Sequence, residues 1–135
     1  MTRFATAFLS FAVLAIWTAP PALAAGDVAA GEKSFKKCEV CHTVAAGKTK
    51  PTGPNLLGVV GRKAGSADYK YSDAIQKAAA KGLVWDEKNI SAYIEDPKKF
   101  LAEYTGDAKA MNKMQFSLKN PKEREDIIAY LKSLK

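Results

Sequence analysis

The spacing of apolar side chains predicts a helical chain whose clearest helix lies at the carboxyl end. Its apolar stripe consists of Ile127, Tyr130, Leu131 and Leu134. These positions follow the i, i+3, i+4, i+7 spacing that lines one face of an α-helix. Asn120 and Pro121 precede the stripe as a cap residue and a proline suited to the first helical position, and Glu123 follows at the third. The alternation of apolar and polar positions typical of strands is nearly absent.

Cap residues predict two shorter helices in the first half of the chain. Asp27 can cap a first helix that runs to about Val40. Ser72 or Asp73 can open a second helix. This second helix is expected to stop at Gly82, because glycine favours the position just past a helix end.

Two further helices are predicted to begin at aspartates. Asp86 caps the first of them, with Trp85 and Ile90 placed as a hydrophobic staple across its first turn. Asp96 followed by Pro97 predicts another short turn of helix, because proline suits the first helical position.

A long loop is predicted between residues 43 and 71. It is punctuated by Gly47, Pro51, Gly53, Pro54, Gly58, Gly61 and Gly65. Glycine and proline at this density indicate turns, and a loop of this length usually carries function or folds over something. Since no internal repeat appears after residue 25, residues 26–135 are expected to form one all-α domain with long, ordered loops.

The first 25 residues have the composition of a secretory signal peptide. Arg3 is their only charge, residues 5–17 are almost entirely small or apolar, and residues 22–24 form an A-x-A cleavage pattern after two prolines. The alternative is an uncleaved membrane anchor, but a span needs about 20 apolar residues. We therefore expect removal of residues 1–25 and, in a bacterium, a mature domain in the periplasm.

Composition narrows the function further. The chain has 135 residues, a net charge of +7, two cysteines and one histidine. These counts exclude a four-ligand zinc site of Cys and His, a disulfide-dense scaffold and a His–His metal pair. Only three of the six phenylalanines and one of the two tryptophans lie beyond residue 24, so something other than side chains is expected to fill the core.

Cys38, Cys41 and His42 form a C-x-x-C-H motif at the end of the first predicted helix. This motif is typical of covalent c-type haem attachment, in which both cysteines form thioethers and the histidine coordinates the iron. A redox dithiol is the alternative, but it needs a βαβ context that this chain lacks. A structural disulfide across two intervening residues is a further alternative in an oxidising compartment.

The second axial iron ligand is expected to be a methionine, because no other histidine exists. Beyond the initiator the chain has only Met111 and Met114, and both lie in a polar, lysine-rich stretch. Their alternative role is gap-filling in the core. Met114 is the better candidate, because Phe116 can cover the same apolar pocket. A His/Met pair raises the reduction potential and leaves no vacancy for oxygen or peroxide.

Several further motifs stand in order along residues 26–135. They are Thr52-Gly53-Pro54-Asn55-Leu56, Gly61-Arg62-Lys63-x-Gly65, Tyr71-Ser72-Asp73-Ala74, Lys113-Met114-x-Phe116 and Glu123-Arg124-Glu125-Asp126-Ile127-Ile128-Ala129-Tyr130-Leu131. Together with the C-x-x-C-H motif, they make the chain resemble a class I cytochrome c, of the bacterial cytochrome c2 type.

The resemblance implies roles for individual residues. The Pro54 carbonyl would accept a hydrogen bond from the Nδ1 of the axial histidine. Arg62, Tyr71 and Trp85 would hydrogen-bond or neutralise the haem propionates, and Tyr93 would reach the sulfur side of Met114. For Trp85 and the tyrosines, ordinary core packing is the alternative.

The resemblance also implies that the two terminal helices cross. Gly31 and Phe35 would pack there against Ile127 and Tyr130. The chain departs from the mitochondrial pattern in a longer approach to the methionine, residues 105–112. It also carries Asn112 in place of a common threonine and Ile75 in place of a frequently polar residue.

Basic residues gather in the two segments that flank the expected iron ligands. Residues 33–63 hold seven basic and one acidic side chain, and residues 98–122 hold six and two. This pattern predicts a positive ring around an exposed haem edge, with Lys36, Lys37, Lys48, Lys98, Lys109 and Lys113 as candidate docking residues. Plain solvation of these lysines is the alternative. Nucleic-acid binding is not expected, given export and the lack of a binding motif.

The resemblance implies a monomeric periplasmic carrier of single electrons, not an enzyme. It would accept electrons from a cytochrome bc1-type complex and pass them to a terminal oxidase or a photosynthetic reaction centre. The alternative is a haem enzyme or ligand-binding protein, such as a peroxidase, in which Met114 leaves the iron.

Overall fold

The computed structural model of the protein describes residues 26–134. The predicted signal peptide, residues 1–25, lies outside the described residues and stays a prediction. The described chain contains five helices, α1 (Val28–Phe35), α2 (Asp73–Ala80), α3 (Glu87–Glu95), α4 (Pro97–Thr105) and α5 (Pro121–Ser133). Across residues 26–134 the only β-pairing is two isolated bridges, so the predicted all-α class is confirmed. No helix in this range is long and apolar enough to cross a bilayer.

Each helix begins at a predicted cap residue. In all five, the cap side chain accepts a hydrogen bond from the backbone N–H three residues further on, which satisfies one of the free donors at the helix start. The caps are Asp27, Ser72, Asp86, Asp96 and Asn120. The helix starts are therefore confirmed, and the helix from Asp96 is longer than the single turn expected, at nine residues.

The end predicted for the first helix is wrong. α1 stops at Phe35, five residues before Val40, and the chain continues as a series of tight turns. The N–H of Cys38 donates to the Phe35 carbonyl at 2.7 Å, and the N–H of Cys41 donates to the Cys38 carbonyl at 3.1 Å. Because i→i−3 turns eclipse side chains three residues apart, the two cysteines still share one side of the chain.

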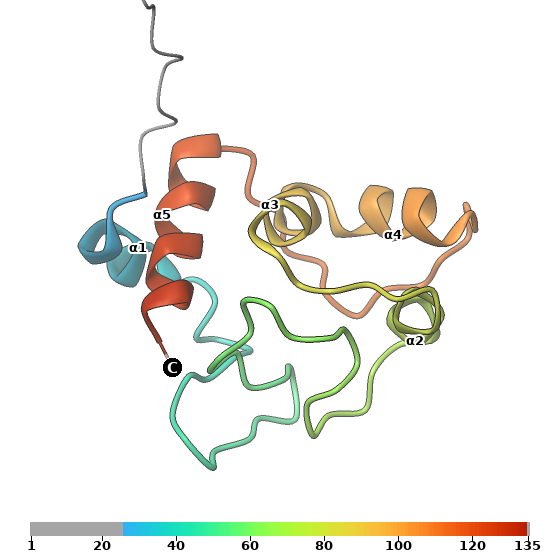
Figure 1. Cartoon of the computed structure of the whole chain (residues 1–135), viewed down its shortest axis with the longest axis horizontal. Coiled ribbons are helices and arrows are strands. Elements are labelled where there is room, and N and C mark those ends of the chain that lie inside the picture. The colour runs from blue at the N-terminus through green and yellow to red at the C-terminus, as the bar shows by residue number, and fades with distance from the viewer. Residues whose placement is uncertain (1–25, 135) are drawn as a thin grey trace, which may run out of the picture.

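The two terminal helices, α1 and α5, pack across each other, as expected (Figure 1). A Cβ on Gly31 would lie 1.9 Å from the Asp126 carbonyl oxygen and 2.8 Å from the Cβ of Tyr130, so only glycine permits this approach. The rings of Phe35 and Tyr130 pack beside the crossing, with centroids 5.4 Å apart. The backbone N–H of Asp27 also donates to the Asp126 carboxylate at 2.6 Å, which ties the start of α1 to α5.

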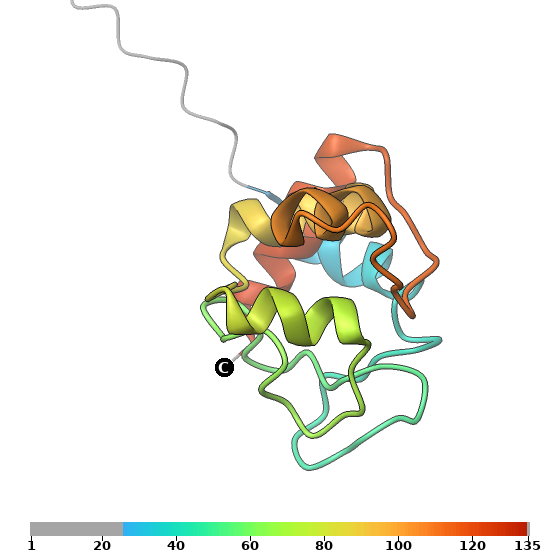
Figure 2. The same ribbon diagram turned by 90° about the vertical axis from the view of Figure 1, so that its right-hand side faces the viewer.

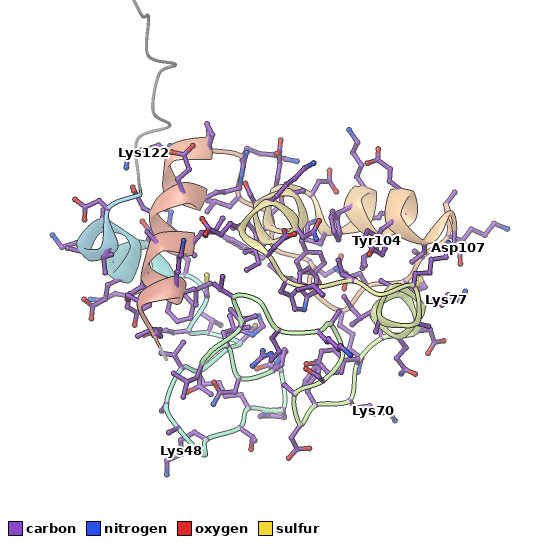
Figure 3. The ribbon with its side chains drawn as sticks, in the orientation of Figure 1. Lys48, Lys70, Lys77, Tyr104, Asp107 and Lys122 are labelled. Carbon is purple, nitrogen blue, oxygen red and sulfur yellow. The ribbon has the colours of Figure 1, made fainter. Side chains whose placement is uncertain are left out.

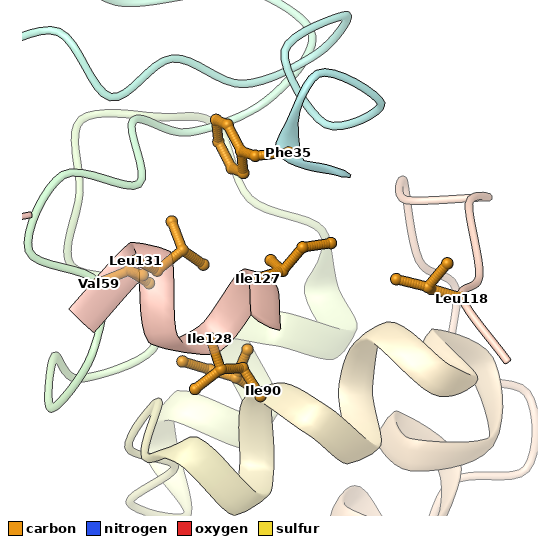
Figure 4. Packing of buried hydrophobic residues seen from close by; sticks show 7 residues of the cluster. All are labelled: Phe35, Val59, Ile90, Leu118, Ile127, Ile128 and Leu131. Atoms are coloured by element: carbon orange, nitrogen blue, oxygen red, sulfur yellow. The ribbon is translucent and has the colours of Figure 1, made fainter. Parts of the chain in front are cut away.

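Two buried apolar clusters surround the middle of the domain. The first comprises Phe35, Val59, Ile90, Leu118, Ile127, Ile128 and Leu131. Figure 4 shows Ile127 and Leu131 pointing from α5 toward Phe35, whereas Ile128 points toward Ile90. α5 therefore buries a wider face than the predicted stripe, which did not include Ile128.

The second cluster is made mostly of small side chains. It comprises Ala64, Ala74, Ile75, Ala78, Leu83, Leu101 and Ala110. Alanine contributes little apolar volume, and the larger side chains that pack against this cluster, five aromatics among them, are only partly buried. The predicted long loop, residues 43–71, is confirmed, and Figure 2 shows it folded beneath α2. Loop and helices together enclose the space that the site occupies.

Candidate cofactor site

A cavity of about 360 Å³ lies between the long loop and the helices. Every residue assigned to the site from the sequence lines it, namely Cys38, Cys41, His42, Pro54, Arg62, Tyr71, Trp85, Tyr93, Met114 and Phe116. These residues come from five separate stretches of the chain, so the fold alone brings them together. The volume is within the range of ligand-binding pockets in proteins.

His42 is held in one orientation and one tautomer. Its Nδ1 lies 2.8 Å from the Pro54 carbonyl oxygen, the hydrogen bond expected from the resemblance. A carbonyl oxygen only accepts, so Nδ1 carries the proton and the Nε2 lone pair is left free for a metal. Burial lowers the pKa of His42, against the opposing effect of the Pro54 hydrogen bond, and this favours the neutral imidazole that coordinates iron.

Gly53 presses against His42, and the assignment from the sequence did not include it. A Cβ at Gly53 would lie 2.7 Å from the Cε1 of His42 and 2.8 Å from its Nδ1. The neighbouring Thr52 hydroxyl donates to the Cys41 carbonyl at 3.1 Å, which closes the loop over the histidine. The sequence Thr52-Gly53-Pro54 contained the clue to this contact. Gly53 directly precedes Pro54, the hydrogen-bond partner of His42, and only glycine permits the backbone to come so close to the ring.

The two cysteines lie at the cavity wall with no disulfide between them, Cys38 half-buried and Cys41 exposed. Burial, aided by the charge of Glu123, raises the pKa of Cys38 to about 11. Redox-active cysteines of C-x-x-C motifs have lowered pKa values instead, because they react as thiolates. The site therefore disfavours a redox dithiol, and its thiols are placed to be attached to a group inside the cavity.

The two methionines of the described chain differ sharply in position. Met114 is half-buried and lines the cavity. Met111 is 79% exposed and does not line it. Neither fills a gap in the buried core, which was the alternative role for both. Phe116, 40% exposed, lies on the cavity wall two residues beyond Met114.

Arg62 supplies positive charge to the cavity. Its guanidinium donates to the Asn55 carbonyl at 2.8 Å and to the Leu57 carbonyl at 3.1 Å, which leaves donors free for an anionic group. Burial lowers the pKa of Arg62, and burial raises the pKa of the adjacent Tyr71 hydroxyl. The Arg62 guanidinium and the Tyr71 hydroxyl are therefore partly desolvated, as expected of groups that would bind haem propionates inside the cavity.

An aromatic wall closes another side of the cavity. The ring of Tyr93 lies 4.9 Å from that of Trp85 and 5.8 Å from that of Phe100. The Tyr93 hydroxyl donates to the Oδ1 of Asn112 at 3.1 Å, and burial raises the pKa of Tyr93 to about 12. Tyr93 thus reaches the Met114 segment through Asn112, a site residue that the sequence assignment did not include.

The residues present fit a haem. The cavity offers two thiols, an imidazole with a free Nε2, a thioether and a guanidinium, set in a largely apolar lining that includes Ile75, Ile90 and Leu131. Soft sulfur and neutral imidazole are the axial ligands of haem iron in electron-transfer proteins. No group of three or more His, Cys, Asp or Glu side chains in residues 26–134 could hold a bare metal ion.

Comparison with known proteins gives one consistent result. Residues 28–135 match the model of a protein family described as Cytochrome c. The chain is 49% identical to a cytochrome c2 of Cereibacter sphaeroides, with 93% of each chain covered. It is 51% identical to a cytochrome c2 of Rhodospirillum rubrum, covering 84% of this chain and 85% of the relative. The structure of cytochrome c2 from Rhodobacter sphaeroides superposes with a TM-score of 0.75 at 49% identity, covering 81% of this chain and 96% of the other.

Proposed function

This chain belongs to the cytochrome c family, and from that premise we propose that it is a periplasmic electron carrier with His42 and Met114 as axial ligands. The family consists of electron-transfer proteins rather than enzymes, and its cofactor is a covalently bound haem c. The observation that carries the proposal is the presence of a free imidazole Nε2 and a thioether in the lining of one cavity.

The chain's residues divide the work of holding the cofactor. When bound, the haem supplies one-electron chemistry, because its iron changes between the ferrous and ferric states. Cys38 and Cys41 would attach the group covalently, and the Pro54 carbonyl would keep His42 in the coordinating tautomer. With His42 and Met114 both bound to the iron, no site would remain for oxygen or peroxide, which favours a carrier over a peroxidase.

Part of the cavity wall is packed core, which would limit the movement of the haem ligands during electron transfer. Buried side chains of the first core cluster, including Phe35, Ile127 and Leu131, form part of the lining. Packing at crystal-like density resists displacement, so the ligands would move little between oxidation states. We further propose that residues 105–117 and the long loop leave one haem edge close to the surface, where electrons enter and leave.

The partners we propose are membrane redox complexes. The donor would be a cytochrome bc1-type complex, and the acceptor a terminal oxidase or a photosynthetic reaction centre. Of the six candidate docking lysines, Lys37 and Lys113 line the cavity. Lys37 pairs with Glu123, and Lys113 lies 5.2 Å from the ring centre of Tyr69. Lys48 lies out on the long loop (Figure 3). If these charges steer docking, electron transfer slows with rising ionic strength, whereas a flat salt dependence argues against steering.

Optical spectra of the haem-loaded protein test the ligand assignment. The oxidised wild type is expected to show a methionine–iron charge-transfer band and to bind cyanide slowly. Met114→Ala removes the band and opens the iron to cyanide, whereas the control Met111→Ala, at an exposed position, leaves the spectrum unchanged. A high-spin wild-type spectrum, or a band that survives Met114→Ala, contradicts the assignment.

The mass of the secreted protein tests export and attachment together. If the chain is cleaved after Ala24 or Ala25 and carries covalent haem, its mass equals that of the shortened polypeptide plus one haem. Such a protein has no free thiol. Retention of residues 1–25 in the mature protein contradicts export by cleavage.

A further inference from the structure

The segment that carries Met114 has almost no backbone support of its own. Within residues 26–134, residues 111–117, here termed the Met114 strap, make no backbone–backbone hydrogen bond. The strap is held at its ends, where the Ala110 N–H donates to the Asp107 carbonyl at 3.0 Å and the Leu118 N–H donates to the Ile94 carbonyl at 2.7 Å. Ala110 and Leu118 are both buried, so the freedom of the chain is confined between them.

The approach to the strap is fixed to α2. The Lys77 ammonium pairs with the Asp107 carboxylate at 2.9 Å, and both lie at the right-hand side of the view in Figure 3. The Lys81 ammonium donates to the Thr105 carbonyl at 2.7 Å and thereby satisfies an acceptor at the end of α4. These two ties fix residues 105–110, so the position of Met114 depends on the contacts that the side chains of the strap make.

Asn112 makes the contact that reaches Met114. The side-chain Nδ2 of Asn112 donates to the backbone carbonyl of Met114 at 2.9 Å. The backbone carbonyl of Asn112 accepts from the Gln115 side chain at 2.8 Å. Because the Met114 carbonyl can only accept, the amide must present Nδ2 to it and Oδ1 to Tyr93. The Tyr93 hydroxyl therefore donates to Asn112, and its single proton is not available to the sulfur of Met114.

The other end of this chain of hydrogen bonds is rigid. Tyr93 belongs to α3, and its ring packs against those of Trp85 and Phe100, which also stack on each other. A side chain whose ring is already held by packing loses little further freedom when it forms a hydrogen bond.

The strap is also held at Lys113, whose ammonium donates to the Lys70 carbonyl and lies over the ring of Tyr69. The hydrogen bonds from Tyr93 to Asn112 and from Asn112 to Met114 are the ones that connect a packed helix to the Met114 backbone.

We propose that Asn112 is a positioning residue that holds Met114 in the cavity by joining its carbonyl to Tyr93. The inference rests on the proposed ligation of iron by Met114. In the absence of the Asn112 side chain, the strap between Ala110 and Leu118 samples more conformations in which Met114 has left the iron. An external ligand then competes more successfully for the axial position, while the fold around the two core clusters stays intact.

Imidazole binding to the oxidised, haem-loaded protein tests this inference, because imidazole must displace the axial methionine. Asn112→Leu keeps the size of the side chain and removes its hydrogen bonds, and Tyr93→Phe removes only the hydroxyl. Loss of one or two such bonds is expected to raise imidazole affinity about 2- to 10-fold. Met111→Ala, in the same strap but exposed and outside the cavity lining, is the matched control with wild-type affinity.

The double variant distinguishes a connected chain from two independent effects. Because Tyr93 acts on Met114 through Asn112, the double variant is expected to bind imidazole no more tightly than Asn112→Leu alone. Urea midpoints and the methionine–iron band in the absence of imidazole report the fold and the ligand separately. The inference is overturned if Asn112→Leu and Tyr93→Phe both behave like Met111→Ala, or if their effects multiply.

The two proposals fail in different ways. If Met114→Ala leaves the charge-transfer band intact, the assignment of the ligand is wrong. If Met114→Ala abolishes the band but Asn112→Leu leaves imidazole affinity unchanged, the ligand is right and the positioning role is wrong. Should Asn112→Leu fail to incorporate haem, Tyr93→Phe alone decides, since it removes a single oxygen atom.

Discussion

Replacing Gly31 by alanine tests the crossing of the terminal helices most directly. On an exposed helix this change stabilises by about 1 kcal/mol, because glycine is a poor helix former. Here the new Cβ would lie 1.9 Å from the Asp126 carbonyl oxygen, and an ordinary contact begins at 3.4 Å. α1 and α5 would have to separate by roughly 1.5 Å, the difference between these two distances, which a close-packed interior resists.

The separation disturbs more than one contact. The rings of Phe35 and Tyr130, now 5.4 Å apart, would move away from each other, and the bond from the Asp27 N–H to the Asp126 carboxylate would lengthen. Overpacking of a core typically costs 1–3 kcal/mol. The clash here is with backbone, so we expect Gly31→Ala to lower the free energy of unfolding by about 3 kcal/mol despite the better helix propensity.

Urea denaturation of the haem-loaded protein, followed by circular dichroism, measures this loss. Glu32→Ala serves as the control, because Glu32 is the next residue of the same helix and is exposed. It is expected to change the unfolding midpoint little. If Gly31→Ala is as stable as the wild type, or more stable, the helices cross less closely than described and the reasoning fails.

Two other substitutions probe the site and the acid stability of the fold. Gly53→Ala forces a Cβ to within 2.7 Å of the His42 ring, so it should weaken iron ligation by His42 and shift the optical spectrum of the haem-loaded protein. An unchanged spectrum would mean that the loop moves away from His42 and that the close contact is not needed. Lys122 and the Asp27 N–H lower the pKa of Asp126 below its ordinary value. A lowered carboxyl pKa stabilises the fold above the unfolded value, about 3.9, and this contribution disappears as pH falls through the folded value. Asp126→Asn should therefore reduce the free energy of unfolding near neutral pH and make it fall less steeply below about pH 4. Unfolding measured as a function of pH checks this, and a pH dependence below about pH 4 equal to that of the wild type would contradict it.

The helix starts and the attachment motif could be predicted from sequence because they depend on neighbours a few residues apart. A cap such as Asp86 or Asn120 bonds the N–H three residues onward, so its partner is set by position in the chain. The spacing of Cys38, Cys41 and His42 likewise holds the geometry of attachment within five residues. Local signals of this kind needed no knowledge of the fold.

The end of the first helix could not be predicted in the same way. The apolar and polar pattern after Phe35 is compatible with further helix, but the chain turns there, and the cysteines face the cavity from tight turns. Ile128 was missed for a related reason, since α5 buries a second face against Ile90 of α3 that no single-helix stripe reveals.

The positions of the two methionines relative to the cavity depend on tertiary structure. The sequence favoured Met114 over Met111 because Phe116 follows it, but only the fold shows that Met114 lines the cavity and that Met111 is exposed to solvent. The same holds for Gly53 against His42 and for Asn112 between Tyr93 and Met114. These contacts join residues from 2 to 19 positions apart, and the longest depends on α3 and the strap packing together. Hydrophobic burial is non-directional and indifferent to order along the chain, so only the assembled core shows which side chains meet.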